Sequence, residues 1–166
     1  MILDRLRWAK FFATIKHRDQ KYSNGLPYTH HLAAVAAVAV RYGYGSDRDM
    51  MEATWLHDVV EDTGTKLKEI AEMFGDRVAE LVGAVTNEPG DNRKIRAALT
   101  YPKIRSTNGT VFLKLCDRIA NVEAGGKLVD MYKKEYEDFK RALYTSGQYD
   151  EMWARLDDLL LDKGNV

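Results

Sequence analysis

The chain has 166 residues, a length that fits one domain spanning residues 1–166. Hydrophobic residues make up 45% and charged residues 30%, which excludes a disordered chain because enough apolar surface is available to build a core. Lys plus Arg number 25 and Asp plus Glu number 25, so the formal net charge is zero. That balance argues against a nucleic-acid partner, which needs a basic excess to neutralise phosphates.

The lone cysteine and the N-terminal segment both bear on the compartment. Cys116 has no intrachain partner for a disulfide, which suits a reducing environment. Residues 1–12 carry charges where a signal peptide needs an unbroken apolar run. The longest apolar stretch, residues 32–40, is too short to span a bilayer. We therefore expect a cytoplasmic protein without a membrane partner, and the sequence leaves its oligomeric state open.

Helical periodicity runs through nearly the whole chain, and three prolines interrupt it little. Gly, Ser, Asn and Pro mark loops at residues 21–28 and 87–92. The predicted helices are about Asp4–Arg18, His30–Tyr42, Ser46 through Val60, Lys66–Phe74, Asp76–Thr86, Arg93–Ile104, Thr110–Val122, Lys127–Tyr144 and Tyr149–Asp162. The prediction is all-α: a single-domain helical bundle of roughly eight or nine helices.

Residues 56–63, LHDVVEDT, hold one histidine and three acids within six positions. At i,i+4 spacing, His57 lies over Glu61 and Asp58 lies over Asp62, so the four side chains can share one polar cleft. Acids near a helix C-terminus oppose the helix dipole, which makes a solvated acidic stripe a poor explanation. A bound cation or a reaction explains the cluster better.

Further metal ligands would have to come from elsewhere in the chain. His30 and His31 open the apolar second helix, and Asp117 lies in the apolar run LKLCDRIANV. An unpaired buried carboxylate is costly, so Asp117 is either a ligand or a partner of Lys114 and Arg118. Phosphate-loop, dinucleotide-binding and GxSxG motifs are absent from the sequence. Cys116 lies on an apolar helix, where a lone thiol is usually inert packing.

The ordered set His31, His57-Asp58 and Asp117 resembles the HD superfamily of metal-dependent phosphohydrolases. GLPYTHHLAAVA, residues 25–36, resembles the G-x-P-Y-x-x-H-P-x-x-V-A segment of the RelA/SpoT hydrolase domain and the small alarmone hydrolases. LHDVVEDT is nearly identical to that family's second motif, and LKLCDRIANV resembles its K-L-A-D-R-L-x-N motif. The resemblance spans residues 14–122, about two thirds of the chain.

The resemblance implies a reaction and a role for each matching residue. It implies removal of the 3′-pyrophosphate from the guanosine alarmones ppGpp and pppGpp, small-molecule nucleotides of the stringent response. His31, His57, Asp58 and Asp117 would hold Mn²⁺, with other first-row divalent metals possible. Glu61 and Asp62 would orient and deprotonate the attacking water. The implied substrate-binding residues are Lys21, Lys114, Arg118, Asn121, which contacts the sugar, and the loop residues Tyr22, Ser23 and Asn24, with Arg18 a weaker candidate.

The loop at residues 21–24 departs from the family, which carries an arginine that packs on guanine where this chain has Tyr22. We expect the Tyr22 ring to stack on a purine in its place. Asn87 also stands where the family commonly has lysine. These departures leave open a hydrolase of another nucleotide (a dNTP hydrolase, a mononucleotidase or an NADPH phosphatase).

The sequence also bears on whether the protein catalyses a reaction and on the role of its C-terminal helices. A non-catalytic nucleotide-binding protein is a third reading, against which the intact Glu61 and Asp62 count. From about Lys127 the chain is rich in aromatic and charged residues. Its helically spaced Tyr132, Tyr136 and Phe139 are typical of core positions. The chain length leaves no room for a synthetase or regulatory domain after residue 166, so a stand-alone hydrolase is expected.

Overall fold

The computed structural model describes residues 2–161, with side chains from residue 5 onward. This part of the chain forms ten α-helices, one 3-10 helix and no named strand. Their bounds are α1 Ile2–Lys16, α2 Thr29–Arg41, α3 Arg48–Leu56, α4 Val59–Thr63, α5 Leu67–Phe74, α6 Asp76–Val85, α7 Arg93–Ser106, α8 Thr110–Ala124, η1 Gly126–Leu128, α9 Val129–Leu143 and α10 Asp150–Leu160. The predicted all-α fold is confirmed. Among residues 2–161, no helix combines the length and apolar character needed to cross a bilayer.

The third predicted helix is broken into two helices, α3 and α4, and the predicted helix Lys127–Tyr144 begins as η1 and continues as α9. A turn at His57 and Asp58 separates α3 from α4, and the N-cap of α3 is Asp47, whose carboxylate accepts the Met50 N–H at 3.0 Å. The break places Glu61 and Asp62 in the first turn of α4. Because α4 has only five residues, both acids also lie within one turn of its C-cap Gly64.

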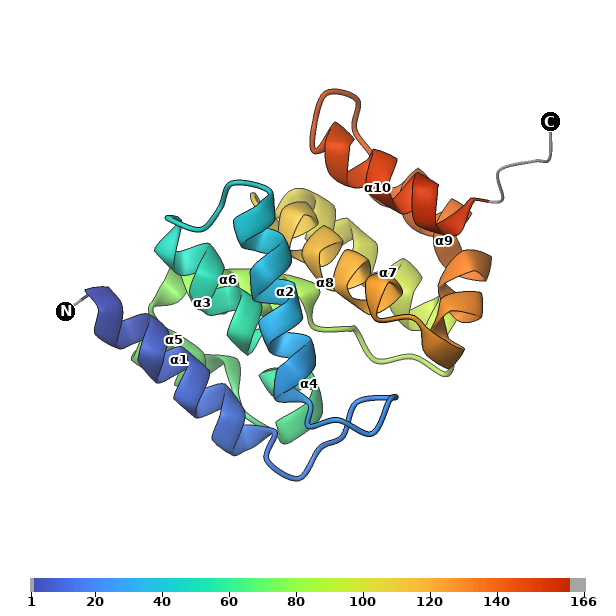
Figure 1. Ribbon diagram of the computed structural model, residues 1–166. Helices are drawn as coiled ribbons and strands as arrows, with labels where there is room; N and C mark the ends of the chain where they lie inside the picture. Colours follow the sequence, from blue (N-terminus) through green and yellow to red (C-terminus); the bar gives the residue numbers. More distant parts are fainter. Residues whose placement is uncertain (1, 162–166) are drawn as a thin grey trace.

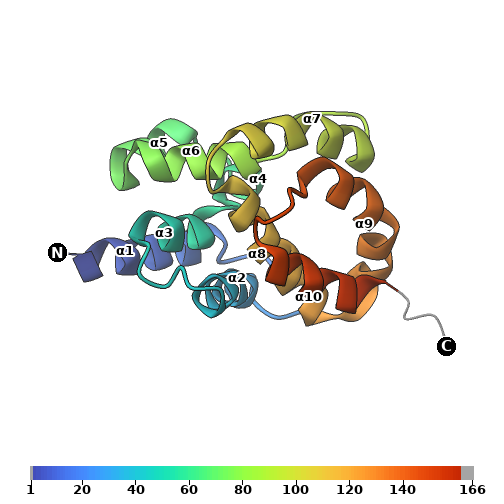
Figure 2. The ribbon, with the colours of Figure 1, turned by 90° about the horizontal axis from the view of Figure 1, so that it is seen from above.

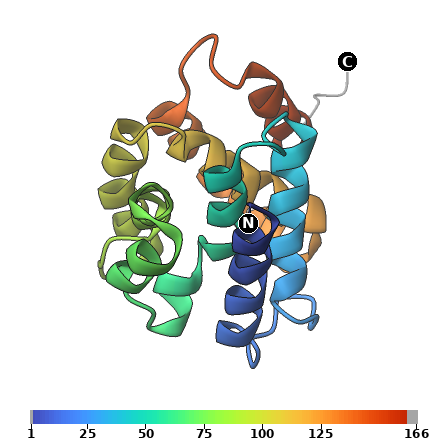
Figure 3. The same ribbon diagram turned by 90° about the vertical axis from the view of Figure 1, so that its left-hand side faces the viewer.

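The helices form two groups joined by α8, as the view from above shows (Figure 2). On one side α1, α2 and α6 pack on α3, and α5 packs on α6 (Figures 1 and 3). On the other side α7, α9 and α10 surround α8. Because α8 also contacts α2, α3 and α6, it is the central helix of the fold.

The position of α8 explains why polar side chains are buried deep in the molecule. Its residues 115–122 are all buried, and they include Asp117, Arg118 and Asn121. The surrounding interior is apolar, with Phe74, Phe112, Phe139 and Trp153 among its largest buried side chains. Buried polar groups cost free energy unless they find partners, so these three residues mark where an interaction site is built.

Candidate metal centre and cavity

His31 is carried into the interior by the apolar face of α2. Leu32, Val35 and Ala36 lie on the same buried face, and small side chains along the helix allow α2 to pack closely on α8. The His31 Nε2 atom lies 3.7 Å from Asp58 Oδ2 and 3.2 Å from Asp117 Oδ1. One turn of α2 therefore reaches carboxylates from two other parts of the chain.

His57 lies at the turn that ends α3, and its ring is held by the backbone. Nδ1 is 2.8 Å from the Thr54 carbonyl oxygen, so Nδ1–H donates and Nε2 carries the lone pair. That buried Nε2 has no hydrogen-bond partner, yet it lies 2.9 Å from Asp58 Oδ2 and 3.6 Å from Asp117 Oδ1. When the imidazole is neutral, its Nε2 lone pair faces two carboxylate oxygens, and either a proton or a bound cation on Nε2 satisfies this arrangement, so these residues fit a metal ion.

The two carboxylates are ionised because of their partners. Burial alone would raise the pKa of Asp117, but the Lys114 ammonium and the two imidazoles hold that pKa well below its usual range. Burial also opposes ionisation of Asp58, yet His57 lowers its pKa to about 2. In the metal-free protein the same carboxylates raise the pKa of His57 well above its ordinary value, against the effect of burial.

Hydrogen bonds orient both carboxylates. The Tyr28 hydroxyl donates to Asp58 Oδ2 at 2.5 Å. Lys114 Nζ donates to Asp117 Oδ2 at 2.9 Å, and Asn121 Nδ2 donates to Asp117 Oδ1 at 2.7 Å. Partners of this kind fix the direction in which a ligand oxygen points. Sequence reasoning missed Tyr28, although the Pro-Tyr pair of the first motif was a signal for it.

All four side chains predicted as ligands come together in the fold. His31, His57 and Asp58 each offer a ligand atom, and these atoms lie within 4.8 Å of one another. Asp117 joins them through its contacts of 3.2 and 3.6 Å with the two imidazoles. Two nitrogen and two oxygen donors can hold a first-row divalent cation.

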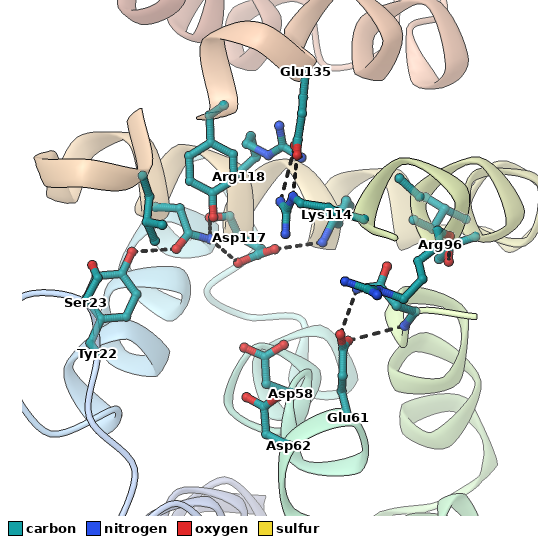
Figure 4. Close-up of a pocket in the computed structure, with 18 of the residues that line it drawn as sticks. Tyr22, Ser23, Asp58, Glu61, Asp62, Arg96, Lys114, Asp117, Arg118 and Glu135 are labelled. Atoms are coloured by element: carbon teal, nitrogen blue, oxygen red, sulfur yellow. Dashed lines mark hydrogen bonds and ion pairs between the residues drawn. The ribbon is translucent and has the colours of Figure 1, made fainter. Parts of the chain in front are cut away.

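Glu61 and Asp62 lie beside this cluster on α4 (Figure 4). Each of them accepts a hydrogen bond from a residue of a distant loop. Asn87 Nδ2 donates to Glu61 Oε1 at 2.7 Å, and Gln20 Nε2 donates to Asp62 Oδ2 at 2.9 Å. Burial raises the pKa of Asp62, and the charges of Asp58 and Glu61 raise it further. A carboxylate with a raised pKa is a better proton acceptor, which suits the predicted role of the pair.

A cavity of about 320 Å³ opens beside these residues, and five basic side chains line it together with five acidic ones, four of which belong to the predicted metal and water site (Figure 4). Its basic lining residues are Lys21, Arg93, Arg96, Lys114 and Arg118. Such a lining suits a ligand with several phosphate groups. The motifs indicated three of these cations. They missed Arg93 and Arg96, because α7 carries no recognisable motif and only packing brings it to the cavity.

Arg118 is buried between two aromatic rings rather than solvated. Its guanidinium carbon lies 4.6 Å from the Tyr132 ring centroid and 4.1 Å from that of Phe139. Nη2 is 3.5 Å from Glu135 Oε2, while the buried Nη1 has no hydrogen-bond partner. Arg93 pairs with the same carboxylate. Tyr132 and Phe139 are therefore core residues, as is Tyr136, but Tyr132 also lines the cavity.

The loop at residues 21–24 only partly reaches the cavity. Lys21, Tyr22 and Ser23 line it, whereas Asn24 is turned to its own loop and accepts the Leu26 N–H at 3.0 Å. The Tyr22 ring stacks on His31, with centroids 5.2 Å apart and planes 4° apart. Burial and nearby groups raise the pKa of Tyr22 to about 12, so its hydroxyl is a donor. One face of the ring is thus not available to a purine.

Two candidates from the sequence lie outside the site. Arg18 is exposed and pairs with its neighbour Asp19 at 3.1 Å, and it does not line the cavity. Cys116 is buried, and burial raises the pKa of its thiol, so it is packing rather than a nucleophile.

Comparison with known proteins points to one family. A family model for the HD domain matches residues 9–145. A guanosine-3′,5′-bis(diphosphate) 3′-pyrophosphohydrolase from Aquifex aeolicus is 37% identical, over 72% of this chain and 18% of its own length. The human MESH1 enzyme of the same name is 34% identical, over 67% of this chain and 64% of its own length. The chain thus spans about a fifth of the first relative and less than two thirds of the second.

Two solved structures share the fold. A metazoan ortholog of SpoT that hydrolyzes ppGpp superimposes with a TM-score of 0.82 at 22% identity, over 98% of this chain and 97% of that one. A Listeria monocytogenes protein, lmo0812, superimposes with a TM-score of 0.62 at 26% identity, over 78% of this chain and 98% of that one. The identity of the first is low, so it supports the fold alone.

Proposed function

Because the chain belongs to the HD domain family, we propose that it is a metal-dependent phosphohydrolase that removes the 3′-pyrophosphate from guanosine alarmones. The observation that carries the proposal is that the predicted ligands His31, His57, Asp58 and Asp117 lie together, with both carboxylates at the wall of a cavity that also carries five basic side chains. The pyrophosphohydrolase names of the relatives at 33–37% identity support the substrate class.

We propose that the four side chains hold Mn²⁺, as the resemblance implies. The bound metal supplies charge that polarises a phosphoryl oxygen and lowers the pKa of a water. Two imidazoles and two carboxylates do not by themselves distinguish Mn²⁺ from Fe²⁺ or Zn²⁺, so metal replacement tests this part of the proposal.

The chain's own acids and bases complete the reaction. Asp62 accepts the proton of the attacking water, favoured by its raised pKa and held in place by Gln20. Glu61, fixed by Asn87, orients the same water. The pyrophosphate gains negative charge as it leaves. That charge is stabilised by three basic residues of the cavity, Lys114, Arg96 and Lys21.

We further propose that residues 1–166 act as a single HD-type domain that works in the cytoplasm on a small-molecule nucleotide. The family match across residues 9–145 and the continuous core around α8 support one domain. The buried, reduced Cys116 is consistent with a reducing compartment.

The test is a release assay for phosphate and pyrophosphate with added Mn²⁺. The substrates are ppGpp, pppGpp, the adenosine alarmone, dNTPs, mononucleotides and NADPH, and the control is His57→Ala. Pyrophosphate release from ppGpp by wild type but not by the control is the expected result. Activity only toward another substrate would contradict the alarmone assignment and leave the hydrolase chemistry standing.

One observation favours a second candidate, an HD hydrolase of another nucleotide. One face of the Tyr22 ring is stacked on His31, so only the other face is left to pack on a base in place of the family's arginine. Base recognition in this chain therefore differs from the family pattern. Selective release of phosphate from NADPH or from a dNTP in the same assay would establish this candidate.

A further inference from the structure

Tyr22 is not one of the predicted metal ligands, but it contacts His31 directly and is linked to Asp117 through one other residue. Its ring lies parallel to the His31 imidazole, at 4° and 5.2 Å between centroids. Its hydroxyl donates to Asn121 Oδ1 at 2.6 Å. The first contact restrains one ligand directly, and the second reaches another through Asn121.

Asn121 links Tyr22 to Asp117 because both the oxygen and the nitrogen of its side-chain amide form hydrogen bonds. Oδ1 accepts from Tyr22, while Nδ2 donates to Asp117 Oδ1 at 2.7 Å and to the Asp117 carbonyl at 3.0 Å. The same Asp117 Oδ1 lies 3.2 Å from His31 Nε2. Tyr22, Asn121, Asp117 and His31 thus form a closed ring of contacts.

The loop that carries Tyr22 is a short hairpin held to α2. Tyr22 N–H donates to the Leu26 carbonyl at 2.8 Å, and Tyr28 N–H donates to the Gln20 carbonyl at 3.1 Å. Gly25 closes the hairpin with φ of +84°, a conformation that disfavours other residues. Backbone hydrogen bonds between the two arms of the hairpin therefore fix the position of Tyr22.

We propose that Tyr22 is a positioning residue for the metal site, acting on His31 through its ring and on Asp117 through Asn121. The inference rests on the proposed function in requiring a metal at the predicted ligands. A neutral phenol suits this place, because it donates to Asn121 without adding positive charge beside a cation.

The experiment measures the Mn²⁺ dissociation constant of metal-stripped protein by competition with a fluorescent chelator, without substrate. Partners that orient ligands are worth about 10–100-fold in metal affinity, so Tyr22→Phe should weaken binding about 10-fold and Tyr22→Ala by up to 100-fold. In an Asn121→Ala background, Tyr22→Phe should have no further effect, because its route to Asp117 is gone. Tyr144→Phe is the matched control, since that exposed ring packs on Trp153 and does not line the cavity.

Wild-type metal affinity in Tyr22→Phe and Tyr22→Ala would overturn the proposal, and so would equal losses from Tyr22→Phe with and without Asn121. A change confined to KM would show that Tyr22 acts on the substrate instead. If Tyr22→Ala does not fold, the proposal is still tested by comparing the effect of Tyr22→Phe on metal affinity in the wild-type protein and in the Asn121→Ala variant. Loss of metal affinity in a protein that never hydrolyses ppGpp would refute the proposed substrate alone.

Discussion

Removing the Tyr28 hydroxyl tests whether the buried carboxylate cluster depends on its donors. Tyr28→Phe keeps the ring, which stacks on His17 with centroids 4.9 Å apart, and removes the 2.5 Å hydrogen bond to Asp58. A hydrogen bond to a charged group is worth about 1.5–3 kcal/mol, more than the median neutral bond. The free energy of unfolding should fall by that amount, because the partly buried Asp58 stays ionised with one donor fewer.

The measurement is urea and thermal unfolding in the presence of a chelator, so that bound metal does not mask the loss. For a chain of this size 1 kcal/mol shifts Tm by about 2–4 °C, which predicts a decrease of about 3–12 °C. Tyr144→Phe serves as the control, and it should change the free energy of unfolding by less than about 0.5 kcal/mol. If Tyr28→Phe matches that control, the bond to Asp58 contributes nothing measurable and the reasoning fails.

Three further outcomes are expected. Glu61→Gln and Asp62→Asn should each lower kcat while metal content, read by elemental analysis, stays at the wild-type value; loss of metal in both would mean that they support the ligands instead. Arg96→Ala should lower kcat/KM about tenfold, equivalent to about 1.4 kcal/mol, with unchanged metal content, because it removes one cation from the cavity. The hydrogen bond from Arg41 lowers the pKa of Glu123. The ionised Glu123 therefore stabilises the fold above about pH 4.3, the ordinary pKa of a glutamate, and this stabilisation is lost as the pH falls through the lowered pKa. Glu123→Gln should flatten that part of the pH–stability curve, and an unchanged curve would refute the link.

The sequence by itself determined the helical class and singled out the four side chains that the fold brings together at the candidate metal site. Apolar periodicity marks each helix, since a helix must bury one face to be stable. His31, His57-Asp58 and Asp117 stood out because they interrupt apolar helices, where polar groups are costly without a partner. These are local properties, and they can be read along the chain.

Tertiary structure alone decided how the site is supported and shaped. The break between α3 and α4 falls at His57 and Asp58, and a periodic pattern that continues through Val60 could not reveal it. Asn87 and Gln20 hold the two acids from positions 26 and 42 residues away, and Arg93 comes from a helix without a motif. Tyr22 could be assigned to the loop but not to its contacts, because the ring's two neighbours, His31 and Asn121, are brought together only when α2 packs on α8.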